Sequence, residues 1–337
     1  MIELNRNELI FTFPEVHEKA RLSVQFQRTL RIPDDDQEPY LPPGLGAFPL
    51  RHVDDFASRL PAAWRRRGGV MMPMHQSEAM WISFRGHAGY PILVKIATGR
   101  IDAVSGKEWS DGVHRDPQDY VVIPDQPWLD GYCVAEGGIR QFVAMPLGQG
   151  DTAEDRVTGK AGHGSIQLLV HPMKRESWAK LRRRGFERLP LGELAYNYLC
   201  DAMPLTPEMD LTPGGRMRPH VYQDKHPFTA WDLRRRSRCF VHIADSLTWR
   251  AVTGEAPPTL PPTAEQYALA GLPWFSHYDG DLQALEGAAN LTGLESIARR
   301  GRRKGEKARP ENEPVSDPVV IALRPDGKRN EVREGEF

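Results

Sequence analysis

The sequence predicts an α+β protein dominated by antiparallel β-strands, forming a sandwich or an open barrel, with short peripheral helices and long ordered loops. Three observations lead to this class. A chain of 337 residues can bury a large core. Its 30 glycines and 29 prolines are spread along the chain, which favours short elements joined by turns over a helical bundle. Apolar and alternating runs of strand length recur through the first 245 residues.

The N-terminal part of the chain predicts strands. Residues 8–13 form a short apolar run, and residues 23–32 alternate with a period of two, as in a strand with one solvated face. Proline and glycine dominate residues 38–49, which predicts an ordered loop or a linker. Residues 54–67 predict a short helix, because a glycine pair follows them at Gly68 and Gly69.

The middle of the chain has the strongest strand pattern, followed by a helix and then irregular structure. A helix is expected over residues 174–184, a further helical turn over 191–200, and a long ordered loop over the proline- and glycine-rich residues 203–219. The candidate strands are residues 70–74, 79–85, 91–97, 120–123, 139–145 and 165–172.

After a predicted strand at residues 238–244, the C-terminal part predicts short helices and then a change of character. Helices are expected over residues 246–252, 263–270 and within 279–300. Residues 299–317 contain almost no apolar side chains, which is typical of a disordered segment. Residues 318–337 predict a hairpin, which needs a sheet edge to dock on, in this chain or in a neighbour.

These patterns divide the chain into four parts by composition and expected structure. They are a β-rich core domain at residues 1–245, a helical C-terminal region packed on it at 246–298, a basic flexible linker at 299–317, and a C-terminal β-hairpin at 318–337.

Composition predicts a soluble cytoplasmic protein without membrane association. No run approaches the roughly 18 apolar residues of a membrane span, and the N-terminus lacks the basic start and apolar segment of a signal peptide. The three cysteines, Cys133, Cys200 and Cys239, form no CxxC pair and no even set, so we expect reduced thiols.

One short motif has the spacing of a metal-binding pair. His114 and Asp116 are separated by one residue, as in the two-histidine, one-carboxylate set of non-haem iron enzymes. A distal histidine would complete the set, and His242, in the middle of a predicted strand, is our candidate; His171 and His220 are alternatives. The residues therefore predict a divalent metal site, or an acid–base pair of His114 with a nearby carboxylate.

The chain has a formal net charge of only −1, but it contains runs of three consecutive arginines. Such clusters bind anions or pair with carboxylates through planar, bidentate hydrogen bonds. Tryptophans lie close to the triplets in sequence, and this combination is also found in proteins that bind single-stranded nucleic acid. The predicted polyanion-binding residues are Arg182, Arg183, Arg184, Arg234, Arg235 and Arg236.

Phosphate-loop, dinucleotide and serine-nucleophile motifs are missing from the sequence. The leading expectation is therefore a non-enzymatic binding or assembly module, with a protein partner or self-association as its mode of action. The first alternative is a metal-dependent enzyme that uses His114 and Asp116. The second is binding of a polyanion or nucleic acid through the arginine clusters.

Three segments resemble parts of bacterial proteins of uncharacterised function. They are residues 140–148, with the sequence RQFVAMPLG, residues 214–218, with GGRMR, and residues 271–275, with GLPWF. The resemblance would span much of the chain, but it implies no activity, cofactor or site.

Overall fold

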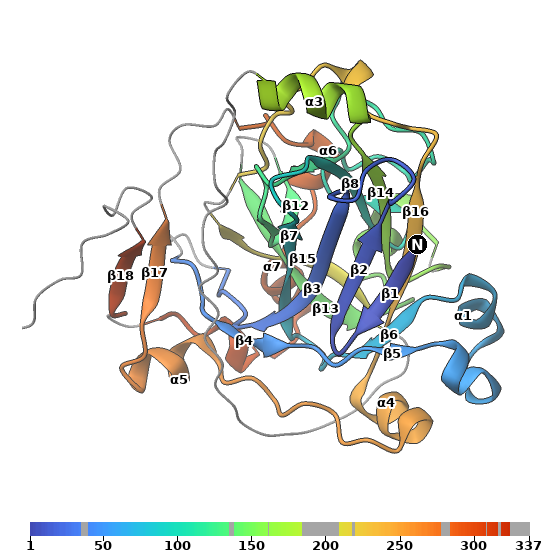
Figure 1. The fold of residues 1–337 in the computed structure, drawn as a ribbon. Helices are drawn as coiled ribbons and strands as arrows, with labels where there is room; N and C mark the ends of the chain where they lie inside the picture. Colours follow the sequence, from blue (N-terminus) through green and yellow to red (C-terminus); the bar gives the residue numbers. More distant parts are fainter. Residues whose placement is uncertain are drawn as a thin grey trace, which may run out of the picture.

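The computed structural model describes residues 1–34, 40–134, 138–160, 162–183, 209–217, 220–277, 284–307, 309–315 and 318–323. In these residues one large, mostly antiparallel sheet carries short helices around it, which confirms the predicted fold class (Figure 1). No helix of the described residues is long and apolar enough to cross a membrane.

The strands of the large sheet follow one path with several short additions. The path runs β1-β2-β3-β7-β13-β15-β16-β14-β8-β10, and neighbours along it are antiparallel. The path strands are β1 (Ile2–Asn5), β2 (Glu8–Thr12), β3 (Arg21–Thr29), β7 (Ala79–Gly86), β8 (Ile92–Thr98), β10 (Val121–Ile123), β13 (Ile139–Pro146), β14 (Ile166–Pro172), β15 (Met209–Met217) and β16 (Ser237–Ala244).

Six short strands extend this path at its sides. β6 pairs with β16 in parallel and carries β5, while the other four each pair with one path strand. Their bounds are β4 (Gly44–Ala47), β5 (Arg51–His52), β6 (Val70–Pro73), β9 (Ile101–Asp102), β11 (Trp128–Leu129) and β12 (Gly131–Cys133).

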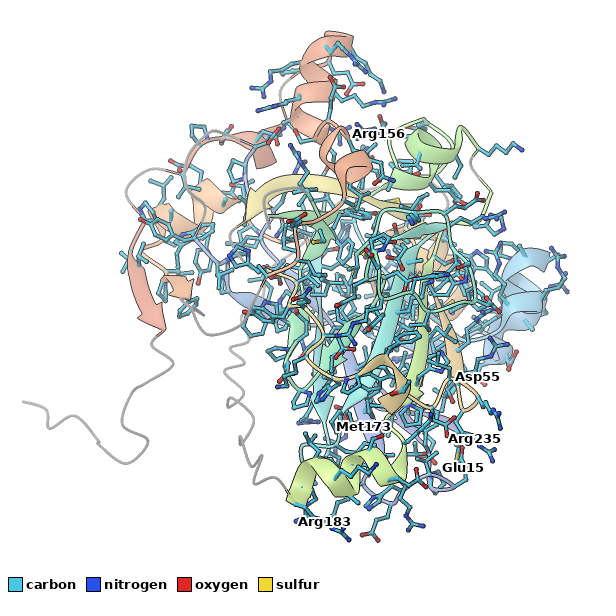
Figure 2. The ribbon with its side chains drawn as sticks, turned by 90° about the horizontal axis from the view of Figure 1, so that it is seen from above. Glu15, Asp55, Arg156, Met173, Arg183 and Arg235 are labelled. Carbon is cyan, nitrogen blue, oxygen red and sulfur yellow. The ribbon has the colours of Figure 1, made fainter. Side chains whose placement is uncertain are left out.

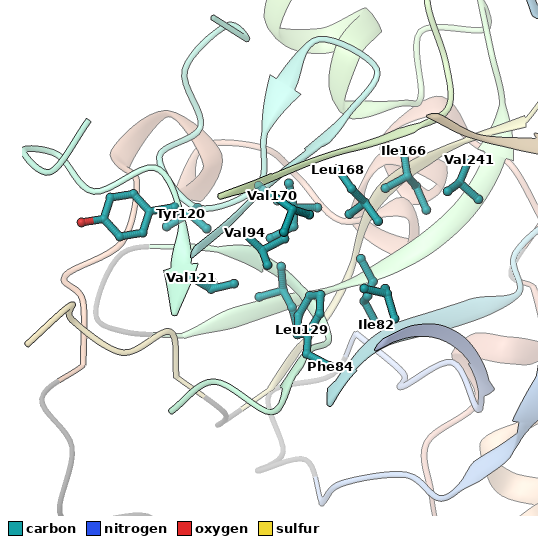
Figure 3. Packing of buried hydrophobic residues seen from close by; sticks show 14 of the residues in the cluster. Ile82, Phe84, Val94, Tyr120, Val121, Leu129, Ile166, Leu168, Val170 and Val241 are labelled. Atoms are coloured by element: carbon teal, nitrogen blue, oxygen red, sulfur yellow. The ribbon is translucent and has the colours of Figure 1, made fainter. Parts of the chain in front are cut away.

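The sheet is strongly curved, so side chains from distant strands meet in one core. Figure 3 shows Ile82 and Phe84 of β7 in the same cluster as Val94 of β8, Leu168 of β14 and Val241 of β16. Every residue of β8, β13 and β14 is buried, because loops and helices cover the face of these strands that points away from this core. A polar residue on such a strand must therefore find its partners inside the protein.

The helices are short and lie at the periphery (Figure 1). The helix predicted at residues 54–67 is divided, because Pro61 holds Leu60 in an extended conformation with ψ 153°. The helices are α1 (Ala62–Arg67), α2 (Ala153–Thr158), α3 (Arg175–Arg183), α4 (Ser246–Thr253), α5 (Ala264–Leu269), α6 (Ala289–Thr292) and α7 (Ile297–Lys304), with the 3₁₀ turns η1 (Asp54–Arg59), η3 (Phe228–Ala230) and η4 (Pro310–Asn312).

Two segments that were predicted to lack regular secondary structure contain a strand and a helix instead. Residues 209–217, expected as a loop, form β15, whose proline and glycines are accommodated by an irregular register between Arg140 and Phe142 of β13. Residues 299–304, expected in a flexible linker, belong to α7, which is capped by Ser296 and anchored by the buried Ile297. The helical turn predicted at residues 191–200 lies outside the described residues.

The C-terminal strand docks within its own chain. β18 (Val320–Leu323) pairs in parallel with β17 (Trp274–His277), and together they form a small separate sheet next to α5 (Figure 1). β17 interrupts the region predicted to be helical, because Trp274 is buried against Tyr267 of α5. The returning strand of the predicted hairpin, residues 330–334, lies outside the described residues.

Candidate functional site

A lysine inside a buried strand organises the most chemically distinctive group of side chains. Lys95 lies in β8 and is 1% exposed. Its Nζ donates hydrogen bonds to the carbonyl oxygens of Ser110 at 3.0 Å and Gly112 at 2.7 Å, and to Oδ2 of Asp119 at 2.8 Å. All three ammonium protons therefore have an acceptor, as burial of the charge requires. The lysine fixes the loop at residues 110–119 to the sheet.

Asp119, which is held by Lys95, in turn makes two hydrogen bonds to His114. Its Oδ1 accepts a hydrogen bond from the His114 backbone N–H at 2.8 Å, and its Oδ2 lies 2.8 Å from the imidazole Nδ1. The Asp119 side chain is 6% exposed, whereas the His114 side chain is 58% exposed. Because a carboxylate accepts, Nδ1 carries the proton, and the lone pair of the neutral imidazole is on Nε2. The His114 imidazole is therefore exposed at the surface, and the buried carboxylate of Asp119 fixes its orientation.

Trp109 lies close to the buried Lys95 and to one arginine, Arg238. Nζ of Lys95 is 4.9 Å from the centre of the indole ring, and Cζ of Arg238 is 6.0 Å from it. These cations lie within the range of favourable contact with an aromatic face. Trp109 thus contacts both the buried Lys95 and Arg238, which lies at the exposed rim of the site.

Asp111 contacts the three side chains that form the rim of the site, Trp109, Arg236 and Arg238. Its Oδ1 pairs with Nη2 of Arg238, its Oδ2 lies 3.5 Å from Nη1 of Arg236, and it accepts a 3.3 Å hydrogen bond from the Trp109 indole. Partial burial acts to raise the pKa of Asp111, but the hydrogen bond and charge of Arg238, with Trp109 and Arg236, lower it overall. The group called the His114 site below consists of Lys95, Trp109, Asp111, His114, Asp119, Arg236 and Arg238.

The residues predicted to bind a metal are not brought together. Asp116 is exposed, and the carboxylate that contacts His114 is that of Asp119. Within the described parts of the chain, no three or more His, Cys, Asp or Glu side chains are placed to hold a metal ion. The turn at residues 115–118 brings the carboxylate of Asp119 back to the His114 imidazole.

His242 has a different environment. It is fully buried in β16, where Nε2 donates to the Gly68 carbonyl at 3.0 Å and Nδ1 accepts from the Ser165 hydroxyl at 2.8 Å. Burial lowers its pKa to about 4, and Trp64 stacks on the ring at a centroid distance of 4.5 Å. Both ring nitrogens are engaged inside the protein, so His242 has no lone pair for a metal ion.

The arginine triplets predicted to bind polyanions are exposed, with one residue outside the described chain. Arg182 and Arg183 lie on α3, Arg184 is not described, and Arg234, Arg235 and Arg236 lie in the turn before β16. Figure 2 shows Arg183 and Arg235 at the same end of the molecule, on separate elements. Of the residues of these two triplets that the structure describes, only Arg236 belongs to the His114 site.

Sequence reasoning missed Lys95, Trp109 and Asp119. The available signal was a lysine within the apolar run at residues 91–97, because a cation in a strand buried on both faces needs a carboxylate or several carbonyl groups nearby.

No family model, no curated protein and no solved structure matches this chain.

Proposed function

We propose that the protein is a binding module and that the His114 site contacts an anionic partner. The observation that carries this proposal is the rim of the site, where Arg236 and Arg238 share one carboxylate, Asp111, and Arg238 lies beside Trp109. Guanidinium groups bind phosphate and carboxylate oxygens in bidentate geometry, and an indole face offers stacking area. The neighbouring Arg234 and Arg235 are exposed and extend the positive surface.

A polyanion titration tests this proposal. A fluorescently labelled single-stranded oligonucleotide serves as the probe, and its anisotropy measures binding at several salt concentrations. We expect an affinity that falls as salt rises, because bound arginines release counterions. The R236Q/R238Q variant should weaken binding by roughly tenfold or more, since charge-assisted hydrogen bonds are lost.

The matched control removes two exposed arginines elsewhere. Arg65 and Arg66 lie on α1 and are exposed, so R65Q/R66Q changes the net charge equally without touching the site. Equal weakening by both double variants would mean that charge alone attracts the probe, and the His114 site would lose its role.

The orientation of His114 supports a second candidate function, acid–base catalysis. A surface imidazole whose Nδ1 is fixed by a buried carboxylate at 2.8 Å has the arrangement of a general base. The nearby arginines would position a phosphate or carboxylate group. Hydrolysis of p-nitrophenyl phosphate and p-nitrophenyl acetate tests this candidate: a rate that disappears in H114Q supports it, and an inactive wild-type protein argues against it.

A further inference from the structure

Two neighbouring strands of the large sheet end side by side, and a side chain that can take part in proton transfer follows each of them. β6 and β16 pair in parallel, with Pro73 opposite Ala244, so both segments leave the sheet at the same edge, next to α4 (Figure 1). His75 comes two residues after Pro73, and Ser246 comes two residues after Ala244. Because residues that follow the carboxyl ends of neighbouring parallel strands lie close together, this register brings the two side chains into contact.

The Ser246 hydroxyl and the His75 imidazole form a hydrogen-bonded pair. Oγ of Ser246 lies 2.8 Å from Nδ1 of His75, and Nε2 of the same ring lies 2.7 Å from the carbonyl oxygen of Pro258. A carbonyl oxygen can only accept, so Nε2 carries the proton of the neutral imidazole. Nδ1 therefore has the lone pair, and the Ser246 hydroxyl donates to it.

A buried ion pair holds the histidine in this orientation. His75 is 6% exposed, and its backbone N–H donates to Oε2 of Glu78 at 2.8 Å. Oε1 of Glu78 pairs with Nε of Arg28 at 2.7 Å. Arg28 also donates from Nη2 to the carbonyl oxygen of Thr259, the residue after Pro258. The same ion pair therefore fixes the backbone of the histidine and the backbone of the segment that accepts from its ring.

A second serine–histidine pair, Ser165 and His242, has the same hydrogen bond in a different environment. Its Oγ–Nδ1 distance is also 2.8 Å, and Nε2 likewise donates to a backbone carbonyl. Both residues are buried, with Ser165 1% exposed, so a substrate cannot reach that hydroxyl. Ser246 is partly exposed at the start of α4 and can be reached from solvent. Accessibility therefore distinguishes the two pairs.

The surroundings of Ser246 favour an apolar acyl group. Leu247, the next residue, is 48% exposed. Residues 256–262, which contain Pro258, have the sequence APPTLPP and are all exposed or partly exposed. Ser246 is the first residue of α4, whose amide dipoles place positive partial charge at this end. Such charge stabilises the negative oxygen that forms when a carbonyl group is attacked.

From this arrangement we propose that Ser246 and His75 form a catalytic pair that hydrolyses esters with a small apolar acyl group. A nucleophilic serine needs a base within hydrogen-bond reach and a third group that orients the base, and here the third group is the Pro258 carbonyl. Such a site is defined by its geometry, and it does not require the serine-nucleophile motif that the sequence lacks. The pair shares no residue with the His114 site and is independent of the function proposed above.

The reaction would proceed in two transfers of the acyl group. Oγ of Ser246 forms a bond to the carbonyl carbon of the ester while its proton moves to Nδ1 of His75. The bond to the alcohol oxygen then breaks, and the alcohol leaves with the proton from Nδ1. A water molecule attacks the acyl-serine in the same way and gives its proton to Nδ1, and Oγ takes that proton back as the carboxylic acid is released.

Labelling with a fluorophosphonate, which reacts covalently with activated serine hydroxyls, tests the proposal without a known substrate. We expect one label per native chain, located at Ser246 by peptide mass mapping, and none in urea-denatured protein. S246A should remove the label, whereas S177A, which changes a partly exposed serine of α3, should retain it. H75Q removes the base and should slow labelling by roughly a hundredfold or more, in protein that circular dichroism shows to be folded.

Hydrolysis of p-nitrophenyl butyrate measures the activity itself. We expect the wild-type rate to exceed the rate in buffer, to fall to the buffer rate in S246A, and to be unchanged in S177A. A label on a residue other than Ser246, an unlabelled native protein, or equal labelling in folded H75Q would each overturn the proposal. A rate that H114Q abolishes and S246A retains would assign hydrolysis to the His114 site, and would overturn it as well.

Discussion

At the scale of single residues, the protein buries several ionisable groups, and their neighbours compensate for the burial to different extents. Lys95 is the clearest example, because its charge is balanced by one carboxylate and two carbonyl groups. Asp102 and Asp130 are buried carboxyl groups with a different balance, in which burial outweighs the hydrogen bonds they receive. Removing the charge of Lys95 should therefore destabilise the protein, whereas removing the ionisable carboxyl group of Asp130 should stabilise it as the pH rises.

Replacing Lys95 by methionine should strongly destabilise the protein. The substitution keeps most of the side-chain volume but leaves the carboxylate of Asp119 buried without its ammonium partner. Breaking a buried ion pair in this way costs about 3–5 kcal/mol of unfolding free energy. Urea denaturation measures the change, and K107M, at an exposed lysine, is the control. A loss below about 1 kcal/mol, the range of a surface pair, would show that Lys95 does not anchor the loop.

Neutralising Asp130 should change the pH dependence of stability. Burial raises the pKa of Asp130 to about 7, against the opposing hydrogen bond of Trp128. The native state then holds a proton that the unfolded chain releases near its ordinary pKa. The stabilisation from this group is present at acidic pH and is lost as the pH rises through 7.

The D130N variant should therefore gain stability relative to wild type between pH 5 and pH 8. The expected gain is about 3 kcal/mol, because the effect accumulates over roughly two pH units and one pKa unit corresponds to roughly 1.4 kcal/mol. Chemical denaturation of both proteins across this range measures it. A constant difference at all pH values would mean that Asp130 titrates normally.

The two described cysteines should behave as unreactive thiols. Cys133 and Cys239 are free and buried, and burial raises the pKa of each to about 12. Reaction with a disulfide reagent needs the thiolate, so both should react only after denaturation. Intact-mass measurement with and without reductant complements this assay. A difference of two daltons would contradict the reduced state expected from the sequence.

At the scale of elements, strands with a clear pattern could be predicted and elements made by tertiary contacts could not. Residues 23–32 alternate because one face of β3 packs in the core, and this pattern can be recognised in the sequence. β15 contains Pro213, Gly214 and Gly215, which indicate a loop, yet pairing with β13 makes it a strand. Strand propensity is decided by such neighbours, which the sequence does not show.

The candidate site was predictable in part for a similar reason. His114 stood out as a histidine among carboxylates, but the choice between Asp116 and Asp119 depends on the course of a turn. Lys95 is 24 residues away from Asp119 in sequence and contacts it only because β8 passes beneath the loop. The spacing of ligands along a chain predicts a site well only when the local structure is regular.

Helix α7 should be a stable element, although its composition predicts a linker. Ser296 accepts a hydrogen bond from the Arg299 backbone N–H at 3.3 Å, and Ile297 is buried. S296A should remove a cap worth about 1 kcal/mol, which corresponds to roughly fivefold faster amide exchange in residues 297–304. Hydrogen–deuterium exchange measures the effect. Unprotected amides in the wild-type helix would support the linker prediction instead.

At the scale of the whole molecule, one core cluster joins the strands of the large sheet, while the small sheet is attached at its side. Deleting residues 318–337 removes β18 and exposes one edge of β17. We expect a lower melting temperature and an unchanged number of subunits in light scattering, because β18 pairs within its own chain. Dissociation of an oligomer would instead indicate that the segment is exchanged between chains.

The strand order also has a consequence for how the chain reaches this state. Among the central neighbours β13, β15, β16, β14 and β8, only β15 and β16 follow one another in the chain. One edge of β8 must therefore wait for β14, and one edge of β14 must wait for β16, before its backbone groups are paired. Long-range pairing of this kind slows folding, because the entropy of loop closure is lost before contacts compensate for it. During synthesis, the apolar strands preceding Ser237 leave the ribosome without a complete partner set. The nascent chain is therefore most exposed to aggregation, and most dependent on chaperones, until β16 has emerged.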